Sequence, residues 1–260
     1  MELGLKGKCV LITGASKGIG AGLAHAFAAE GANLHLAARG ESQLREVQKK
    51  VSERYGVSVD LTPADLSRRG DRRALIEACG EIDILVNNAG ANPGGSLEEV
   101  DETAWREGWD LKVFGYIDLT RLMFARMKAR GQGVIINDIG NGGEIFDAGY
   151  ICGASGNASL MAFTRALGGS SLDHGIRVVG VNPGPVETER IVKLLKRRAI
   201  DLYGDEGRWP ALRKRYPLRR PARVSEVADV IVFLASERRA YVSGTIWTVD
   251  GGIASRQSII

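Results

Sequence analysis

The stretch CVLITGASKGIG, residues 9–20, joins a short apolar run to a glycine-rich turn and the start of a helical pattern. The run at 9–13 predicts a buried β-strand, and glycines at positions 14, 18 and 20 follow it directly. Small residues there let the backbone pass close to a pyrophosphate, and a helix beginning near Gly18 points free N–H groups and its positive dipole end at that anion. Alone, the glycine pattern is a weak signal, because a structural turn explains it equally well.

The same alternation of an apolar run and a helical pattern continues along the chain. We expect further strands at 33–38, 57–62, 82–88, 133–139, 176–182 and 245–250, and helices at 18–30, 41–54, 68–79, 102–129, 152–173 and 225–235. Continuous apolar runs separated by helices are typical of parallel strands that are covered on both faces. The sequence therefore predicts one α/β domain, residues 1–260, with a doubly wound parallel sheet of about seven strands.

One basic segment, residues 187–222, does not follow this alternation. It contains three prolines, and residues 190–223 hold twelve Lys and Arg against three Asp and Glu. It lies between the sixth strand and the next helix, where an open α/β sheet binds ligands beyond the carboxyl ends of its strands. We expect a lid over the substrate, whose cations favour an acidic or phosphate-bearing small molecule such as a coenzyme A thioester. A solvated or subunit-facing surface is the alternative.

Composition narrows the other function classes. Three cysteines without Cys-x-x-Cys spacing argue against a disulfide framework, and no group of residues has metal-ligand spacing, so we predict no metal. No apolar run approaches the roughly 20 residues that cross a bilayer, and the N-terminus lacks the order of a signal peptide. We therefore expect a cytoplasmic protein that binds no membrane. A net charge of +4 with 6% aromatic residues gives little support to nucleic-acid binding.

Three more motifs follow strands at the expected places: NNAG at 87–90, NPGPVET at 182–188 and VSGTIWTVDGG at 242–252. Together with TGASKGIG and the length of the chain, they resemble the short-chain dehydrogenase/reductase family over essentially the whole sequence. The resemblance implies a Rossmann-type subunit that binds NAD or NADP. It also implies a homo-oligomer, a dimer or a tetramer, assembled through the long helices and the C-terminal strand.

The resemblance also assigns the parts of the cofactor. The glycine turn would hold the pyrophosphate, residues 65–66 would line the adenine, residues 88–90 the adenosine ribose and residues 183–188 the nicotinamide end. The cofactor-binding residues expected on this basis and from charge are Gly14, Ser16, Lys17, Gly18, Ile19, Gly20, Arg39, Asp65, Leu66, Asn88, Ala89, Gly90, Pro183, Gly184, Val186 and Thr188.

Charge at the end of the second strand favours NADP(H) over NAD(H). An NAD-preferring member would carry an acid at position 38 to bond the ribose hydroxyls, and this chain has Ala38 followed by Arg39. Lys17 adds a second cation from the glycine turn. Two cations without a carboxylate suit a 2′-phosphate, although Arg39 is also explained as a solvated residue at a strand end.

The catalytic positions depart from the family pattern. Members of the family carry an Asn, a Ser and a Tyr-x-x-x-Lys pair, in which the Tyr transfers the substrate proton and the Lys lowers its pKa. The resemblance places Lys112 at the Asn, Gly140 at the Ser, Cys152 at the Tyr and Gly156 at the Lys. Tyr150 lies two residues too early, so we expect it to enter the helix facing away from the direction of Cys152.

Two charged residues near these positions suggest a replacement. Asp138 shares a strand face with Gly140, and Lys112 lies on the helix beside that strand end, so we expect a Lys112–Asp138 ion pair. The pair would act as a relocated proton donor or would only support the pocket. Cys152, at a helix N-terminus near a lysine, would be either a reactive thiol or an inert buried one. The candidate catalytic residues are Lys112, Asp138 and Cys152.

These features predict an NADP(H)-dependent oxidoreductase that interconverts a carbonyl and an alcohol with an atypical active site. The alternative is a catalytically inactive NADP(H)-binding subunit or sensor that partners an active relative. A third reading keeps the nicotinamide as a structural or electrostatic element for a non-redox reaction.

Overall fold

Seven short strands pair side by side in the computed structural model, which describes residues 2–256. All neighbouring strands are parallel, in the order β3-β2-β1-β4-β5-β6-β7. The strands are β1 (Cys9–Thr13), β2 (Asn33–Ala38), β3 (Val59–Pro63), β4 (Ile84–Asn87), β5 (Gly133–Asp138), β6 (Ile176–Pro183) and β7 (Ile246–Val249). The predicted α/β fold and its doubly wound sheet are confirmed.

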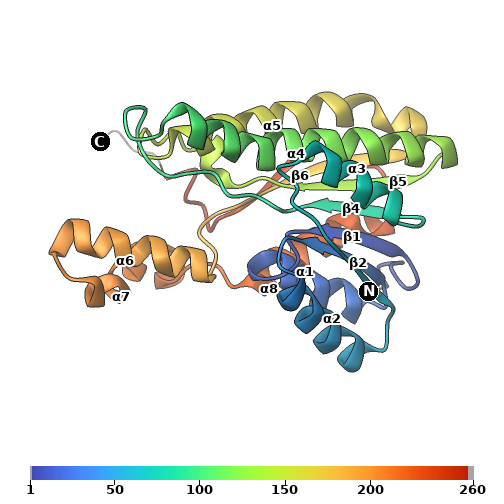
Figure 1. The fold of residues 1–260 in the computed structure, drawn as a ribbon, viewed down its shortest axis with the longest axis horizontal. Coiled ribbons are helices and arrows are strands. Elements are labelled where there is room, and N and C mark those ends of the chain that lie inside the picture. Colours follow the sequence, from blue (N-terminus) through green and yellow to red (C-terminus); the bar gives the residue numbers. More distant parts are fainter. Residues whose placement is uncertain (1, 257–260) are drawn as a thin grey trace.

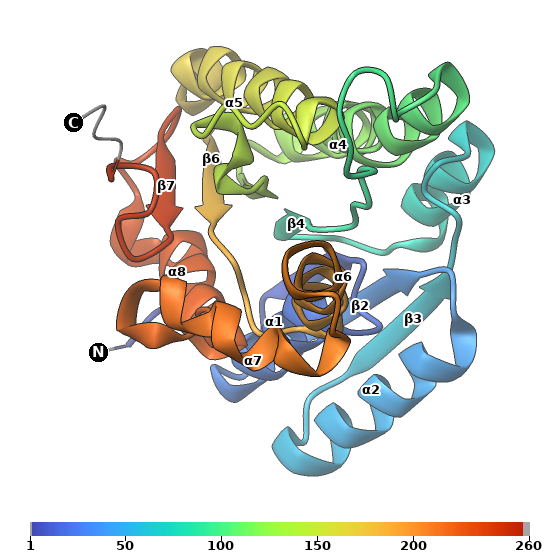
Figure 2. The ribbon, with the colours of Figure 1, turned by 90° about the vertical axis from the view of Figure 1, so that its left-hand side faces the viewer.

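Helices cover both faces of this sheet (Figures 1 and 2). One face carries α1 (Gly18–Ala29), α2 (Glu41–Tyr55) and α8 (Val224–Ala235). The other face carries α3 (Arg69–Ala78), α4 (Glu102–Arg130) and α5 (Ile151–Ser171). These six helices lie where the apolar periodicity predicts them.

Alternation along the strands divides the core between the two faces, because successive strand residues point in opposite directions. Val10 and Ile12 of β1 pack in one cluster with residues of α1 and α8. Leu11, between them, packs in another cluster with Leu75 of α3 and Leu119 of α4. Burial on both sides explains why these strands have continuous apolar sequences.

The order of the strands fixes where a ligand binds. The chain winds outward from β1 through β2 to β3, and then from β4 to β7 on the other side. Such a reversal opens a crevice at the carboxyl ends of β1 and β4. The glycine turn and the segments that follow β4, β5 and β6 therefore meet at one edge of the sheet.

The basic segment contains more helix than the sequence suggested. It forms α6 (Glu189–Tyr203) and the short α7 (Trp209–Leu212), which project from the body of the molecule (Figure 1). Leu195, Ala199 and Leu212 give it a small core of its own. Within residues 2–256, no helix combines the length and apolar character needed to cross a membrane.

Candidate active site

The turn after β1 brings backbone very close to backbone. Gly14 and Gly18 have φ values of +66° and +57°, in the left-handed region that favours glycine. A Cβ on Gly20 would overlap the carbonyl oxygen of Gly14. The helix N-cap, Lys17, makes no side-chain capping bond, and the first turn of α1 holds no acid. The N–H groups and dipole of α1 thus remain available to an anion, as a dinucleotide pyrophosphate requires.

The ends of β1 and β4 are tied together beside this turn. The Thr13 hydroxyl accepts hydrogen bonds from the backbone N–H groups of Asn88 (2.9 Å) and Ala89 (3.1 Å). The Asn88 amide donates in turn to the Thr13 carbonyl at 2.7 Å. These bonds hold the start of the segment 88–90 beside the glycine turn.

The predicted adenine and ribose residues lie at the ends of β2 and β3. The backbone N–H of Ala64 bonds the Ala38 carbonyl at 3.0 Å, which places Asp65 beside this strand end. A hydrogen bond from the Ser67 hydroxyl is the largest of several effects that lower the pKa of Asp65, and the charge of Arg39 contributes. Arg39 is exposed, whereas Leu66 is buried. A cation therefore lies at this corner where the sequence predicts a 2′-phosphate.

The segment after β6 closes over the glycine turn. Gly184 donates its N–H to the Val249 carbonyl at 3.0 Å, and a Cβ on Gly184 would lie 2.7 Å from Asp250. Val186 forms an isolated parallel bridge with Ala222. Thr188 then reaches the turn, because its Cγ2 is 3.4 Å from the position of a Cβ on Gly18. The structure thus brings the segment expected at the nicotinamide end next to the glycine turn expected at the pyrophosphate.

Lys112 lies at the inner end of the crevice, but it does not form the expected ion pair. Its ammonium donates to the carbonyl of Ile139 at 2.6 Å, and its stem crosses Gly90, where a Cβ would lie 2.8 Å from its Cδ. The ion pairs found among residues 2–256 do not include Lys112 with Asp138. Lys112 reaches one residue past Asp138, to the backbone where β5 ends.

Asp138 and Lys112 nevertheless influence each other through space. Asp138 is 5% exposed, and burial raises its pKa from 3.8 to about 7, against the opposing effect of the Lys112 charge. Burial likewise lowers the pKa of Lys112 from 10.5 to about 8, while Asp138 raises it and Arg190 lowers it further. Tyr116 completes the corner, donating its hydroxyl to the Asp138 carbonyl at 2.8 Å. The half-buried amine and the buried carboxyl can therefore hold or release a proton near neutral pH.

Tyr150 and Arg190 form the outer wall of the same cleft. Tyr150 is the N-cap of α5, as expected, and its ring lies against Gly153, where a Cβ would overlap it. Its hydroxyl is 3.5 Å from the guanidinium of Arg190, in the first turn of α6. The influence of Arg190 on the pKa of Lys112 connects this wall with the buried corner. The sequence analysis did not single out Arg190.

Known proteins share this fold and these motifs along nearly the whole chain. A family model described as enoyl-(acyl carrier protein) reductase matches residues 14–254. An uncharacterized oxidoreductase of Thermotoga maritima is 30% identical over 252 residues, which is 96% of this chain and 98% of that protein. Galactitol 2-dehydrogenase (L-tagatose-forming) of Cereibacter sphaeroides is 31% identical over 95% of each chain. The chain belongs to the short-chain dehydrogenase/reductase family.

A solved short-chain dehydrogenase/reductase extends the likeness to three dimensions. The crystal structure of L-sorbose reductase from Gluconobacter frateurii, complexed with NADPH and L-sorbose, superposes with a TM-score of 0.90 at 33% identity. The match covers 96% of this chain and 98% of that one. The elements that carry the motifs therefore share one arrangement in space.

Cys152 occupies the position where the resemblance expects the tyrosine of a short-chain dehydrogenase/reductase. It is fully buried at the start of α5, and the Trp109 indole donates to its carbonyl at 3.2 Å. Burial raises the pKa of the Cys152 thiol. A nucleophilic or acidic thiol requires the opposite shift, so these surroundings favour the inert interpretation.

The positions expected for the lysine and serine are filled by other side chains. A Cβ on Gly156 would lie 3.2 Å from Val113 and 3.3 Å from the Trp109 indole nitrogen, so neighbours occupy the space of a lysine stem. At Gly140, the Asn157 amide nitrogen would lie 3.2 Å from a Cβ, and it donates to the Gly140 carbonyl at 3.3 Å.

Two buried amides in this region keep unpartnered polar atoms. Asn157 is 3% exposed, and among residues 2–256 its Oδ1 has no hydrogen-bond partner; both polar atoms of the Asn92 amide lack one there as well. Buried amides are normally satisfied, so these atoms are suited to a water or a ligand. Sequence analysis missed both residues. The sequence did contain one feature that marks Asn157 as a site residue: it directly follows Gly156, the position expected for the lysine.

Proposed function

We propose that this short-chain dehydrogenase/reductase is an NADP(H)-dependent oxidoreductase that interconverts a carbonyl and an alcohol, with Lys112 and Asp138 handling the proton. The observation that carries the proposal is that a half-buried amine and a buried carboxyl lie together at the carboxyl end of β5, beside the segments that fit a dinucleotide. The relatives include a dehydrogenase and a reductase, which supports the same reaction class.

The chemistry divides between cofactor and protein. NADPH, held by the glycine turn and the segments after β4 and β6, would supply the hydride for a carbonyl carbon, so the chain has to provide a proton for the carbonyl oxygen. Lys112 is held by the Ile139 carbonyl and can donate one of its remaining protons to that oxygen, and Asp138 can return a proton to Lys112 or donate directly. Their pKa values of about 8 and about 7 are those at which a general acid works best near neutral pH. In the reverse direction the deprotonated forms accept the alcohol proton.

We propose a preference for NADP(H) over NAD(H) from the residues at the end of β2. Ala38 is buried and Arg39 is exposed beside it, so the corner offers a cation and lacks an acid for a ribose 2′-hydroxyl. Arg39→Glu should weaken NADPH binding at least about tenfold and leave NADH binding unchanged or improved, because it places a carboxylate against the 2′-phosphate. Arg45→Glu on the exposed face of α2 is the control. Equal affinity for NADPH in wild type and Arg39→Glu would refute this assignment.

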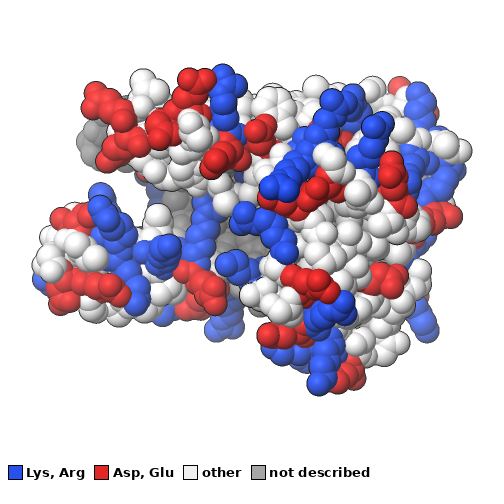
Figure 3. Space-filling model, viewed as in Figure 1, with Lys and Arg blue, Asp and Glu red and all other residues white. Residues whose placement is uncertain are grey.

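The substrate is proposed to carry an acidic group, such as a carboxylate or the phosphates of a coenzyme A thioester. Figure 3 shows a hollow between the projecting α6–α7 segment and the body, with basic side chains along it. Arg190 has no ion-pair partner in residues 2–256, although a cation in the first turn of a helix is electrostatically unfavourable. An anionic substrate would supply that partner, with the segment 187–222 acting as its lid.

The function is tested by following NADPH consumption with a panel of carbonyl compounds, each offered as a carboxylate and as its methyl ester. Lys112→Met and Asp138→Asn should each lower kcat at least about a hundredfold while NADPH affinity stays within about threefold. Lys128→Met, on the exposed face of α4, is the matched control. Unchanged turnover in both variants would remove these residues from the mechanism. Tight NADPH binding without any turnover would favour the non-catalytic subunit or sensor.

A further inference from the structure

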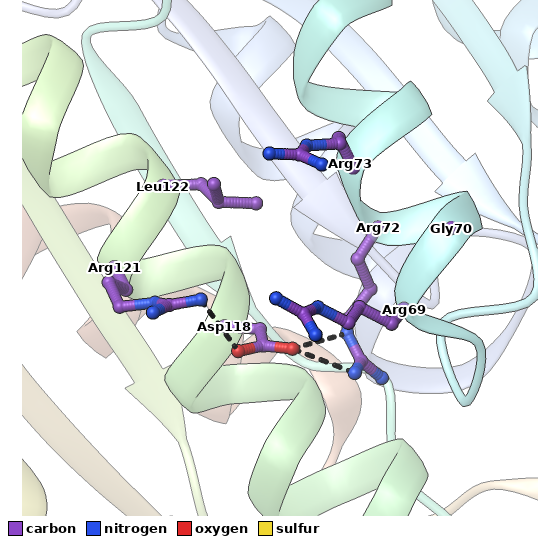
Figure 4. A pocket seen from close by; sticks show the side chains of 7 residues that line it. All are labelled: Arg69, Gly70, Arg72, Arg73, Asp118, Arg121 and Leu122. Atoms are coloured by element: carbon purple, nitrogen blue, oxygen red, sulfur yellow. Dashed lines mark hydrogen bonds and ion pairs between the residues drawn. The ribbon is translucent and has the colours of Figure 1, made fainter.

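A second pocket lies on the outer side of the molecule, between α3 and α4 (Figure 4). Its volume is about 380 Å³, within the usual range for small-molecule sites. The lining residues are Arg69, Gly70, Arg72, Arg73, Asp118, Arg121 and Leu122. Four arginines against one aspartate leave an excess of three positive charges around one cavity.

Arg72 forms the floor of the pocket, and several hydrogen bonds fix the position of its side chain. Arg72 is 5% exposed, and its guanidinium donates to Asp118 at 2.7 and 3.1 Å. It also donates to the carbonyls of Leu66 at 2.8 Å and Ser67 at 3.1 Å. A cation held by this many bonds keeps its place, so the floor is preorganised rather than assembled when a ligand arrives.

The remaining three arginines lack full partners. Arg121 reaches Asp118 only at 3.6 Å, and Arg73 reaches Glu77 only at 3.9 Å. Arg69 takes part in none of the ion pairs found in residues 2–256. Asp118 is already shared between Arg72 and Arg121, so it cannot neutralise the others (Figure 4). Guanidinium groups brought together in this way repel one another unless an anion lies among them.

The α3 side of the cavity is open to an anion as well. Arg69 and Gly70 begin the first turn of α3, whose N-cap, Arg68, makes no side-chain capping bond. The same turn holds Asp71, whose carboxylate accepts a hydrogen bond from the backbone N–H of Asp65 at 2.9 Å. No atom lies within 4 Å of the position that a Cβ would take on Gly70, so its backbone faces open space. Free N–H groups and the positive end of the helix dipole add to the charge of the arginines.

We infer that this pocket binds a compact multivalent anion, with phosphate or carboxylate groups bridging Arg69, Arg73 and Arg121. Guanidinium forks match the oxygen pairs of both groups, and several charges on one small ligand would neutralise all three arginines together. The site is separate from the proposed cofactor crevice, because it opens between α3 and α4 rather than at the carboxyl ends of β1 and β4.

The test is a calorimetric titration of tripolyphosphate into the full-length chain with NADPH at saturation, so that the glycine turn is already occupied. We expect the wild type to bind tripolyphosphate, with the pocket between α3 and α4 accounting for one molecule per chain beside any bound in the hollow at Arg190. Arg69→Gln combined with Arg121→Gln should weaken binding at least about tenfold. Both side chains are exposed, so the double variant should fold, and its thermal midpoint is measured beside each titration.

The control combines Arg45→Gln with Arg106→Gln, which removes the same charge at exposed positions of α2 and α4. It should leave the affinity unchanged. Equal losses in both double variants would reduce the effect to net charge and overturn the proposal, as would the absence of binding. Light scattering adds a further arm: if the Arg69/Arg121 variant changes the oligomeric state and not the affinity, the arginines bind a neighbouring subunit and the proposal is wrong.

Discussion

Asp138→Asn is expected to remove a pH dependence of stability that the wild-type protein shows between about pH 4 and about pH 7. Burial raises the pKa of Asp138 from 3.8 to about 7, so across this window the folded state keeps a proton that the unfolded chain releases. The wild type therefore loses stability as pH increases. At about 1.4 kcal/mol for each pH unit, the full loss amounts to about 4 kcal/mol.

In the variant, Lys112 acts in the opposite direction and so widens the difference from wild type. Without the Asp138 charge, which raises the pKa of Lys112, that pKa should fall further below about 8. The folded variant then sheds this proton earlier than the unfolded chain does, so its stability increases with pH at the upper end of the window. The free energy of unfolding of the variant, relative to wild type, should thus rise by about 4 kcal/mol or more from low to neutral pH.

The assay is urea unfolding of both proteins, followed by circular dichroism at intervals from about pH 4.5 to about pH 7.5. Asp229→Asn, which removes an exposed carboxylate from α8, controls for the change in net charge. A difference between Asp138→Asn and wild type that stays constant with pH would refute the reasoning. Asp138 would then be ionised throughout and could not hold the proton that the proposed mechanism assigns to it.

Four further outcomes follow from the packing of single residues. Arg177→Met should lower the free energy of unfolding by at least about 3 kcal/mol in urea titrations, because the buried guanidinium satisfies four carbonyls at and beyond the end of α8. Gly20→Ala should weaken NADPH binding at least about tenfold by fluorescence titration, because its Cβ would overlap the glycine turn. Cys152→Ala should keep kcat within about threefold, since the thiol is buried with a raised pKa. Asn157→Leu should lower kcat more than NADPH affinity, because it removes the polar atoms beside Gly140 and keeps the volume.

The sheet and its flanking helices could be predicted from sequence because their signals are local. Apolar runs with burial on both faces and helical periodicity need no knowledge of distant residues. The same signal was present in α6, where Ile191, Leu195 and Ala199 recur every four residues and pack on one side. It was overlooked because the segment is dense in Lys and Arg and because prolines follow it, at 210 and 217.

For the candidate site, the sequence predicted where the residues lie but not the hydrogen bonds that they make. Strand alternation and helix order bring Lys112 and Asp138 to one corner, and the structure does place them there. The bond that Lys112 makes was not predictable, because a flexible side chain chooses between a carboxylate and the nearby Ile139 carbonyl. The amide of Asn92, which has no hydrogen-bond partner among the described residues, was equally hidden, since the glycines near it lie on two helices, Gly108 of α4 and Gly156 of α5.

The departures from the family pattern fit one another. Gly90 leaves room for the Lys112 stem, and without that room the ammonium could not reach the end of β5. Gly156 leaves room for Trp109, and the indole in turn bonds the Cys152 carbonyl. A chain that had merely lost its catalytic residues would be expected to keep cavities where those side chains had been, and cavities are costly in a packed interior. Neighbours fill these positions instead, so each change depends on another. A tyrosine at 152 or a lysine at 156 would have to displace these neighbours, because Cys152 is fully buried and a Cβ on Gly156 would already lie 3.2 Å from Val113.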